Sequence, residues 1–407
     1  MNCHDLVHKK ILNSMNKIEG WFQEKRAPLN FPIYSSFDIR DSGCKIAPVD
    51  ANVFPAGFNN ICGADQDSSV DLMKSFIETR YPGRRRIMLF TEEHTENPYY
   101  ADNAYTIRSI IERAGFEVFV AWPRQLPGGQ LHLETASGKT IEVFEAKRVD
   151  GGVVVGGVPV DLIVSNNDFS QTYTEFMDGL DVPMTPAYKL GWHNRRKDVF
   201  FRLYNELVNE FTDIIGIDCG MLNIATETHS DFDINDEASR ARLARHVDEF
   251  LGQLKNQYGS GGVEYEPYVY IKNSAGTYGL GVTAVRNGDD VVAWNNKARK
   301  KMKAAKGGGG FVEVILQEGI PTSVTDEQDG SAEPVIYTLG SQLAGGFLRT
   351  HGKKDVRESL NSPGAVYKRL CVSDLKISVE GLPMENVYGW IGKLGALAVA
   401  QEAQLLS

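Results

Sequence analysis

A lysine at the end of an apolar strand, followed by a run of small residues, is the segment most suggestive of chemistry. It reads Tyr268-Val-Tyr-Ile-Lys-Asn-Ser-Ala-Gly-Thr-Tyr-Gly-Leu-Gly281. Lysine supplies a point charge, and glycines let backbone N–H groups approach phosphate oxygens closely. No GK[ST] pattern and no predicted helix follow, so this is neither a P-loop nor a dinucleotide-binding turn. The residues expected to bind the phosphates of ATP are Lys272, Gly276, Thr277, Gly279 and Gly281. The alternative is a β-hairpin with an incidental lysine.

A second segment could contact the base of the nucleotide. The apolar strand that ends in Gln317 and Glu318 turns into a short acidic connection containing Ile320. Backbone groups in such a connection can face the edge of an adenine. We therefore add these three residues to the expected ATP site.

Three residues further along suggest phosphoryl transfer with a metal ion. Arg349 ends another predicted strand and could hold a transferring phosphoryl group. Glu358 and Asn361 place a carboxylate and an amide oxygen close together in the chain, and Glu333 is a further candidate ligand. Mg²⁺ takes oxygen ligands and often uses only one or two carboxylates beside phosphates. The sequence therefore predicts ATP and one or two Mg²⁺ ions as cofactors, with Lys272 and Arg349 as the catalytic residues.

Residues 37–60 form a dense polar block in which charges of both signs alternate with asparagines, and glycines and prolines fix the turns. An amino acid carries an ammonium and a carboxylate group, so its pocket needs both signs at close range. The expected substrate-binding residues are Asp38, Arg40, Lys45, Asp50, Asn52, Asn59 and Asn60. The alternative is a polar loop with internal ion pairs. Cys44 lies in this block without a histidine nearby in sequence, so we do not expect it to act as a nucleophile.

Three segments, Val49–Asn60, Lys272–Gly281 and Glu358–Gly364, together resemble the proteobacterial ATP-grasp type of glutamate–cysteine ligase, and the resemblance covers most of the chain. The segment Glu358…Asn361-Ser-Pro is similar to the metal-binding segment of bacterial glutathione synthetases, with the spacing changed by one residue. The resemblance implies that the γ-carboxylate of glutamate is activated by ATP as an acyl phosphate and joined to the amine of cysteine, the first step towards glutathione. It also implies that Lys197 is the first ATP lysine, although its run of basic residues equally suits a solvated helix start.

The residues alone leave other functions open. Another ATP-grasp ligase would join a different carboxylate to a different amine. A small-molecule kinase would release ADP and a stable phosphoester without needing an amine. A non-catalytic nucleotide-binding module would keep the glycine loop, but it could dispense with the Glu358 and Asn361 pair.

The elements that must position these residues predict an α/β fold, with an α+β C-terminal part. Strand, helix and strand at 86–90, 100–114 and 116–121, with an apolar run at 161–165, indicate a parallel sheet. Helices are predicted at 4–26, 193–211, 235–257 and 385–404, and further strands at 266–272, 280–286, 311–317, 334–339 and 343–349; residues 31–60 show little periodicity. With the resemblance, this gives a Rossmann-like N-terminal substrate-binding domain at 1–190 and an ATP-grasp domain at 191–407, whose lid subdomain covers about 258–320.

Composition limits the partners. The 407 residues are 42% hydrophobic and 24% charged, which is ordinary for folded chains with sizeable cores. The net charge of −10 disfavours binding to nucleic acid, and no apolar run is long enough to span a membrane. The 5 scattered cysteines and the polar start of the chain predict no disulfide framework, no zinc site and a cytoplasmic location. The expected partners are small-molecule substrates, and the sequence is compatible with a homo-oligomer.

Overall fold

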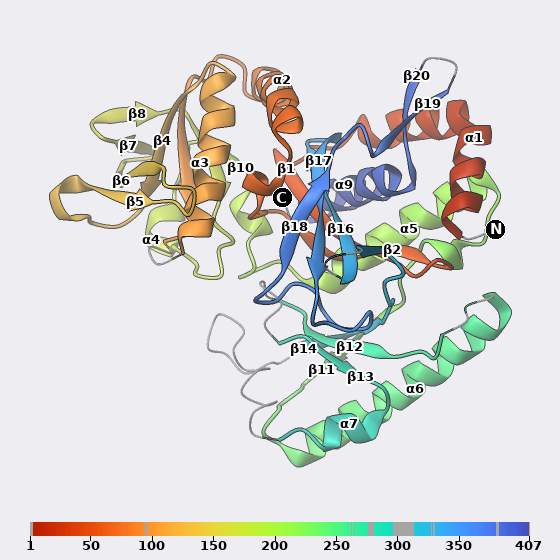
Figure 1. Cartoon of the computed structure of the whole chain (residues 1–407). Helices are drawn as coiled ribbons and strands as arrows, with labels where there is room; N and C mark the ends of the chain where they lie inside the picture. Colours follow the sequence, from red (N-terminus) through yellow and green to blue (C-terminus); the bar gives the residue numbers. More distant parts are fainter. Residues whose placement is uncertain are drawn as a thin grey trace.

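The computed structural model describes residues 3–93, 97–261, 263, 265–275, 281–295, 313–326, 328, 330–379 and 382–406. Gly276, Thr277 and Gly279 of the predicted phosphate loop lie outside these described residues, whereas Gly281 lies within them. The described chain forms three lobes, each built on a sheet of its own (Figure 1). The mixed α/β class predicted from the sequence is confirmed.

The first lobe contains the parallel sheet. Its strands are β3 (Arg86–Thr91), β4 (Glu117–Trp122), β5 (Gln130–Glu134), β6 (Thr140–Val149), β7 (Gly152–Val155), β8 (Val158–Val160), β9 (Leu162–Asn166) and β10 (Met184–Thr185), and its helices are α3 (Pro98–Arg113) and α4 (Thr174–Met177). Strand β3 pairs in parallel with β4 and β9, and β9 pairs in parallel with β10, as the strand–helix–strand pattern predicted. Met88 and Leu89, which point to opposite faces of β3, are both fully buried in different core clusters, because both faces of such a sheet are covered.

The central lobe is an antiparallel sheet assembled from both ends of the chain. Its strand order is β18 (Val366–Leu370), β17 (Gln342–His351), β16 (Gly330–Leu339), β1 (Tyr34–Asp41) and β2 (Ile46–Asn52), with β15 (Thr325–Asp326) beside β16. Because β1 pairs with β16, the predicted domain of residues 1–190 is not one structural unit. Its first strands belong to the sheet of the C-terminal part.

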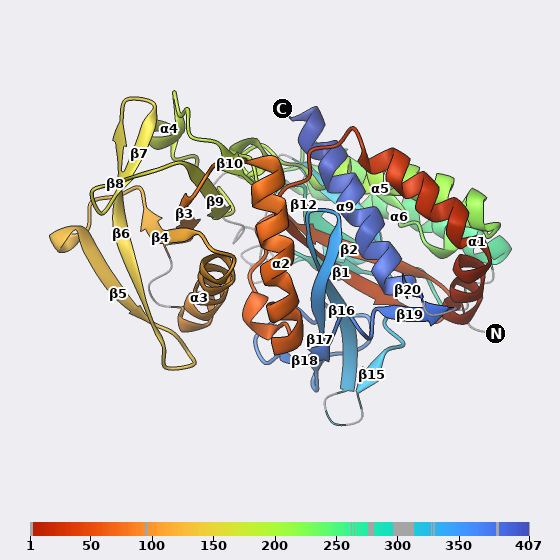
Figure 2. The same cartoon turned by 90° about the horizontal axis from the view of Figure 1, so that it is seen from above.

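Helices cover one face of this central sheet. They are α1 (Cys3–Arg26), α5 (Lys197–Ile215) and α9 (Val387–Leu405), which lie side by side (Figure 2). Phe37 and Ile39 of β1 are fully buried in the core beneath them. Side chains alternate across a strand, so Asp38 and Arg40 point to the opposite face. That second face carries the candidate site.

The third lobe is a four-stranded antiparallel sheet in the order β11 (Thr226–Ser230), β14 (Glu313–Glu318), β12 (Val269–Asn273) and β13 (Thr283–Val285). Helices α6 (Glu237–Gly261) and α7 (Gly288–Val292) pack against it around a core of their own (Figure 1). The predicted lid subdomain at 258–320 covers only part of this lobe, since β11 and most of α6 precede residue 258.

The structure adds to the sequence analysis at two places. Residues 31–60, which show little periodicity in the sequence, contain the regular strands β1 and β2. No disulfide framework was expected, and a disulfide bond joins Cys62, which precedes α2 (Gly63–Arg80), to Cys371, which follows β18. This cross-link removes the cysteine-based argument for a reducing compartment.

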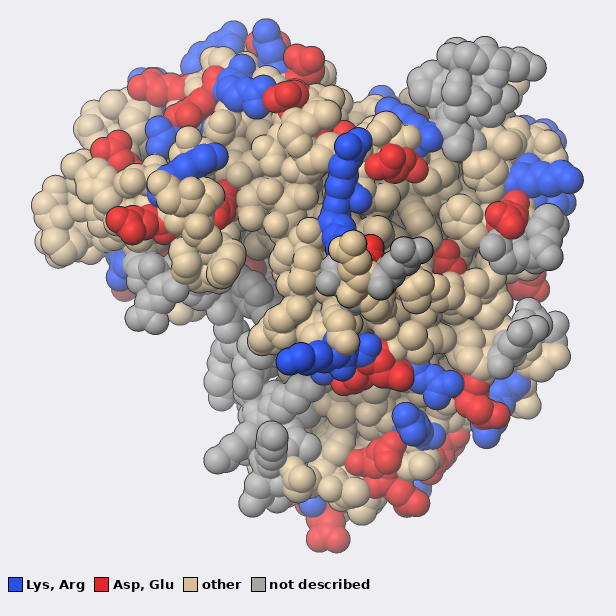
Figure 3. Space-filling view, in the orientation of Figure 1, with Lys and Arg blue, Asp and Glu red and all other residues tan. Residues whose placement is uncertain are grey.

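The remaining described strands are β19 (Lys376–Val379) and β20 (Leu382–Glu385), which pair with each other. Within the described ranges, no helix has the length and apolar character needed to cross a membrane. Acidic and basic side chains are interspersed over the three lobes on the face seen in Figure 3.

Candidate active site

Two lysines predicted to bind ATP converge on one aspartate, although they come from different lobes. Lys197, the first residue of α5, lies 2.5 Å from Asp50 of β2, measured from Nζ to Oδ1. Lys272 of β12 is buried near the same carboxylate, and its Nζ donates to the Val49 carbonyl oxygen at 2.7 Å. The backbone N–H of Lys197 donates to the Ser274 carbonyl oxygen, which joins the start of α5 to the segment after Lys272. The structure thus brings both lysines to the edge of the central sheet.

Lys197 and Lys272 shift the pKa of the Asp50 carboxyl, and Asp50 in turn affects the pKa of Lys272. Burial alone would raise the pKa of the Asp50 carboxyl, but the nearby Lys197 and Lys272 ammonium groups lower it instead. Burial lowers the pKa of Lys272 to about 8, against the opposing attraction of Asp50. Lys272 is therefore mostly charged at neutral pH and loses its charge at moderately alkaline pH.

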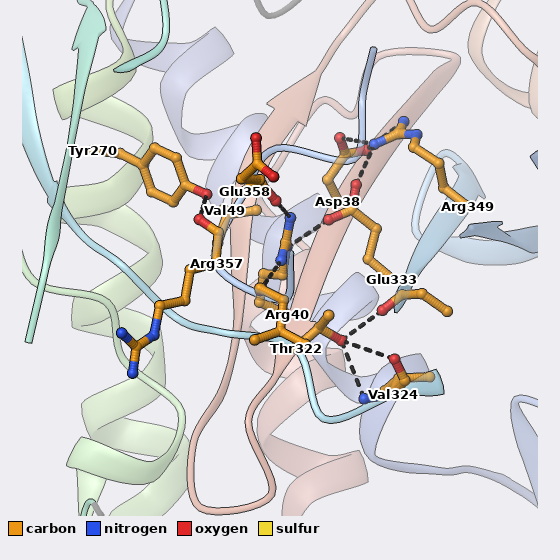
Figure 4. A network of polar contacts seen from close by, with 12 residues as sticks. Asp38, Arg40, Val49, Tyr270, Thr322, Val324, Glu333, Arg349, Arg357 and Glu358 are labelled. Atoms are coloured by element: carbon orange, nitrogen blue, oxygen red, sulfur yellow. Dashed lines mark hydrogen bonds and ion pairs between the residues drawn. The ribbon is translucent and has the colours of Figure 1, made fainter. Parts of the chain in front are cut away.

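Asp38, the register partner of Asp50, belongs to a buried cluster of two arginines and two carboxylates (Figure 4). Arg349 Nη1 donates to Asp38 Oδ2 and to Glu333 Oε1, both at 2.7 Å. Arg40 Nε lies 2.5 Å from the other Glu333 oxygen. Asp38 and Asp50 are register partners on β1 and β2, so their side chains share one face of the sheet with Glu333 and Arg349.

Burial raises the pKa of the Asp38 carboxyl, although Arg349 opposes the shift. The pKa of Arg349 is raised, because the attraction of Asp38 and Glu333 outweighs the burial of its charge. Arg349 is thus a permanent cation held between two acids. Its Nε has no hydrogen-bond partner in the described part of the chain and can donate to a further anion.

The connection predicted to contact adenine is tied into the protein core. Glu318 is fully buried, and its carboxylate accepts from Lys45 Nζ at 2.7 Å and from the Tyr258 hydroxyl at 2.7 Å. Lys45, predicted to bind substrate, is therefore engaged at the end of β14 and not in the Asp38 cluster. Gln317 accepts from Lys272 Nζ at 2.6 Å, which places its side chain beside the phosphate-binding lysine. Ile320 is fully buried in the main core.

A cavity of about 1390 Å³ opens between the first lobe and the central sheet. Its walls include Asn59 and Asn60 from the predicted substrate block, and Asn361 and Tyr367 from the segment around β18. Arg349 and Tyr367 are register partners on β17 and β18, so the cavity adjoins the buried cluster. The size of the cavity is sufficient for amino-acid substrates.

The two metal ligands predicted near the end of the chain have surroundings different from those of Glu333, which is buried between Arg40 and Arg349. The Glu358 carboxylate accepts from Lys354 Nζ at 2.8 Å and from the Asp355 N–H at 3.0 Å, and its side chain is 47% exposed. Its hydrogen bond to Lys354 lowers the pKa of the Glu358 carboxyl. Asn361 lies on the cavity wall. Asn52, the last residue of β2, is half-buried.

Sequence reasoning missed two residues that shape the site. Asn103 of α3 accepts from the backbone N–H groups of Gly57 and Phe58 and so fixes one cavity wall. The Tyr270 hydroxyl donates to the Arg357 carbonyl oxygen at 2.5 Å. The alternation Tyr268-Val-Tyr270-Ile-Lys272 places Tyr270 on the face of Lys272 and could have revealed it. Nothing in the local sequence distinguishes Asn103.

Paired lysines beside buried acids and an arginine lie between two antiparallel sheets of a mixed α/β chain, an arrangement that suits a ligase driven by a nucleoside triphosphate. Residues 8–403 match the GshA family, described as glutamate-cysteine ligase. The chain belongs to this family.

Solved structures extend the comparison. The crystal structure named "Putative gamma-glutamylcysteine synthetase" from Methylobacillus flagellatus KT is 33% identical, covers 98% of this chain and 96% of its own, and superposes with a TM-score of 0.87. D-alanyl-alanine synthetase A from Vibrio cholerae is 11% identical over 79% of this chain and 81% of its own, with a TM-score of 0.36. A glutathione synthetase-like effector from Globodera pallida is 10% identical over 90% and 85%, with a TM-score of 0.39. A comparison with curated protein sequences found no match.

Proposed function

We propose that this site joins the γ-carboxylate of glutamate to the amine of cysteine at the expense of ATP. The observation that carries the proposal is a pair of buried donors, Arg349 Nε and Gln317 Nε2, which have no hydrogen-bond partner in the described part of the chain. An unpaired buried donor costs about 1–3 kcal/mol. A ligand rich in acceptor oxygens at both places removes that cost, and a carboxylate and a nucleoside triphosphate are such ligands. Membership of the glutamate–cysteine ligase family supports the same choice.

The proposed reaction has two steps. A γ-carboxylate oxygen of glutamate attacks the terminal phosphorus of ATP, and the bond from that phosphorus to the bridging oxygen breaks, which releases ADP. The cysteine amine then attacks the acyl carbon, phosphate leaves, and the amine loses a proton. Lys197 and Lys272 supply positive charge to the phosphates, and Arg349 stabilises the moving phosphoryl group. Catalysis rests on positioning and charge, as expected for phosphoryl transfer.

We propose that Asp38, Asp50 and Glu333 hold Mg²⁺, in place of Glu358 and Asn361. Their carboxylates share one face of the central sheet, and oxygen donors of this kind fit the ion. Each is paired with a side-chain cation in the structure, so Mg²⁺ would have to take the place of that cation. When bound, Mg²⁺ neutralises charge on the phosphates. The cytoplasmic location and the homo-oligomer expected from the sequence stay predictions.

The large cavity is proposed to hold the amino acids. Its walls carry the amides of Asn59, Asn60 and Asn361, which can both donate to a carboxylate and accept from an ammonium group. The neighbouring Arg349 orients the reacting carboxylate towards the lysines. Arg40 pairs with Glu333 and Lys45 with Glu318, so the proposal gives neither residue a direct contact with substrate.

The test is ADP release by the purified protein with Mg²⁺ and ATP, with amino acids added singly and in pairs. Turnover that needs glutamate and cysteine together, with formation of the dipeptide identified by mass, supports the proposal. A stable phosphorylated product from one substrate without an amine indicates a kinase, and dependence on a different pair indicates another ligase. Lys272→Ala should abolish turnover, whereas Lys25→Ala, which removes an exposed ion pair with Glu210, is the matched control.

A further inference from the structure

Three consecutive backbone carbonyl groups are held by side chains from two different sheets. Arg40 Nη1 donates to the Val356 oxygen at 3.0 Å, and Arg40 Nη2 donates to the Glu358 oxygen at 2.7 Å. Between them, the Arg357 oxygen accepts from the Tyr270 hydroxyl at 2.5 Å. Figure 4 shows both side chains directed at this short segment. We call residues 356–358 the strap.

Arg40 links the strap to the buried cluster. It lies on β1 of the central sheet, is only 3% exposed, and uses its third nitrogen, Nε, to hold Glu333. All three nitrogens of the guanidinium group are therefore engaged, two with the strap and one with a carboxylate of the proposed metal site. The planar fork of arginine suits this task, and a lysine ammonium group at the same place could not reach all three partners.

Tyr270 links the strap to the lobe that carries the phosphate-binding lysine. Tyr270 and Lys272 are two residues apart on β12, so their side chains share a face, and Lys272 Nζ lies 5.6 Å from the tyrosine ring centroid. The Arg357 guanidinium group lies 5.9 Å from the ring centroid of Tyr268, the residue just before this strand. The strap therefore contacts β12 through Tyr270 and the residue that leads into β12 through Arg357.

We infer that Arg40 and Tyr270 are positioning residues. Through their hydrogen bonds to the strap, they set the distance between Lys272 and the Asp38–Glu333–Arg349 cluster. The inference rests on the proposed function, because phosphoryl transfer between these groups needs them in fixed alignment. Lys272 and the cluster lie on separate sheets, and the strap is a short spacer held by both. Glu358 then contributes through its backbone oxygen, while its carboxylate faces Lys354.

Kinetics of two variants test this role. Tyr270→Phe removes one hydroxyl from the strap, and Arg40→Lys removes the fork. We expect each to lower kcat about tenfold or more while KM for ATP changes less than about threefold, since small misplacement affects the transition state more than nucleotide binding. The double variant should be about as slow as Arg40→Lys alone, because both substitutions release one element. Tyr204→Phe is the matched control, since its buried hydroxyl also donates to a backbone oxygen, that of Leu222, away from the strap.

Hydrogen exchange separates failure of the strap from failure of the proposed function. Amides in a peptide spanning residues 354–360 should exchange faster in Tyr270→Phe than in Tyr204→Phe, whatever the substrates are. If wild-type protein does not ligate glutamate and cysteine, the proposed function fails, and the exchange result alone decides whether the strap exists. If wild type is active, a Tyr270→Phe enzyme with kcat within twofold of wild type overturns the inference. A rise confined to KM for ATP, or fully additive losses in the double variant, overturns it as well.

Discussion

Asp38 and Arg349, which lie 311 residues apart in the chain, form a buried ion pair across the central sheet, with 2.7 Å between Oδ2 and Nη1. Strand β16 separates their strands, and its Glu333 accepts from the same nitrogen. Arg349 therefore contacts two buried carboxylates of like charge, and Arg40 supplies a second cation to one of them, Glu333. This relationship exists only because the N-terminal hairpin β1–β2 completes a sheet formed by the C-terminal part.

Replacement of Arg349 should separate catalysis from stability. Arg349→Lys keeps the charge but loses the fork, so we expect kcat to fall about 100-fold in a folded enzyme. Arg349→Ala leaves Asp38 buried without its cation, while Glu333 keeps Arg40, and should lower the free energy of unfolding by about 3–5 kcal/mol. Steady-state kinetics and urea unfolding measure the two effects. Arg108→Lys, at an exposed pair with Glu112, is the control, and an Arg349→Lys enzyme as active as that control contradicts the assigned role.

The Mg²⁺ requirement should distinguish the two sets of proposed ligands. Asp50→Asn removes a carboxylate charge from the central sheet, so we expect the Mg²⁺ concentration for half-maximal rate to rise about tenfold or more. Titration of ADP release with Mg²⁺ at saturating ATP measures this, and chelation of the metal should stop the wild-type reaction. Asp67→Asn, at an exposed pair with Arg113, is the control. A larger rise in Glu358→Gln than in Asp50→Asn would favour the ligand set expected from the sequence.

The sequence predicts the elements whose apolar residues recur with a clear period. It misses a strand that has one apolar face and one charged face. The strand–helix–strand unit around β3 is apolar on both faces and is recognised at once. Strand β1 alternates Phe37 and Ile39 with Asp38 and Arg40, and this period of two could have been detected. Its charged side chains, however, are also typical of a polar loop. Its pairing with β16, almost 300 residues later, is not encoded in any local pattern.

The same distinction holds for the site. Lys197 and Lys272 could be proposed from local segments, and the structure brings them to one carboxylate. The environment of Glu358 could not be predicted, because the neighbouring Lys354 and the Asp355 backbone compete for its carboxylate. The partners of Asp38 and Glu333 depend on register across three strands. Side-chain type indicated which residues belong to the site, whereas the sheet topology determines which of these side chains contact one another.

ATP binding should weaken as the pH rises, because Lys272 loses its proton. Burial lowers its pKa to about 8, so the ammonium form predominates below this value and the neutral amine above it. The triphosphate attracts only the charged form, and we expect the apparent Kd for ATP to rise about tenfold between about pH 7 and about pH 9. Lys272→Arg stays charged over this range and should show a flat profile. Fluorescence titration with a nucleotide analogue measures both, and parallel profiles contradict the prediction.

A buried ion pair between Arg195 and Glu402, outside the Asp38–Glu333–Arg349 cluster, should contribute to the free energy of unfolding. Arg195 Nε lies 3.0 Å from both Glu402 oxygens, and Arg195 Nη1 donates to the Ala51 oxygen beside Asp50. Both residues are almost fully buried, so Glu402→Leu leaves an uncompensated cation and should cost about 3–5 kcal/mol of unfolding free energy. The double variant Arg195→Met with Glu402→Leu removes both charges and should be more stable than Glu402→Leu alone. Urea unfolding measures each, and a double variant less stable than the single would show that the arginine contributes mainly through Ala51.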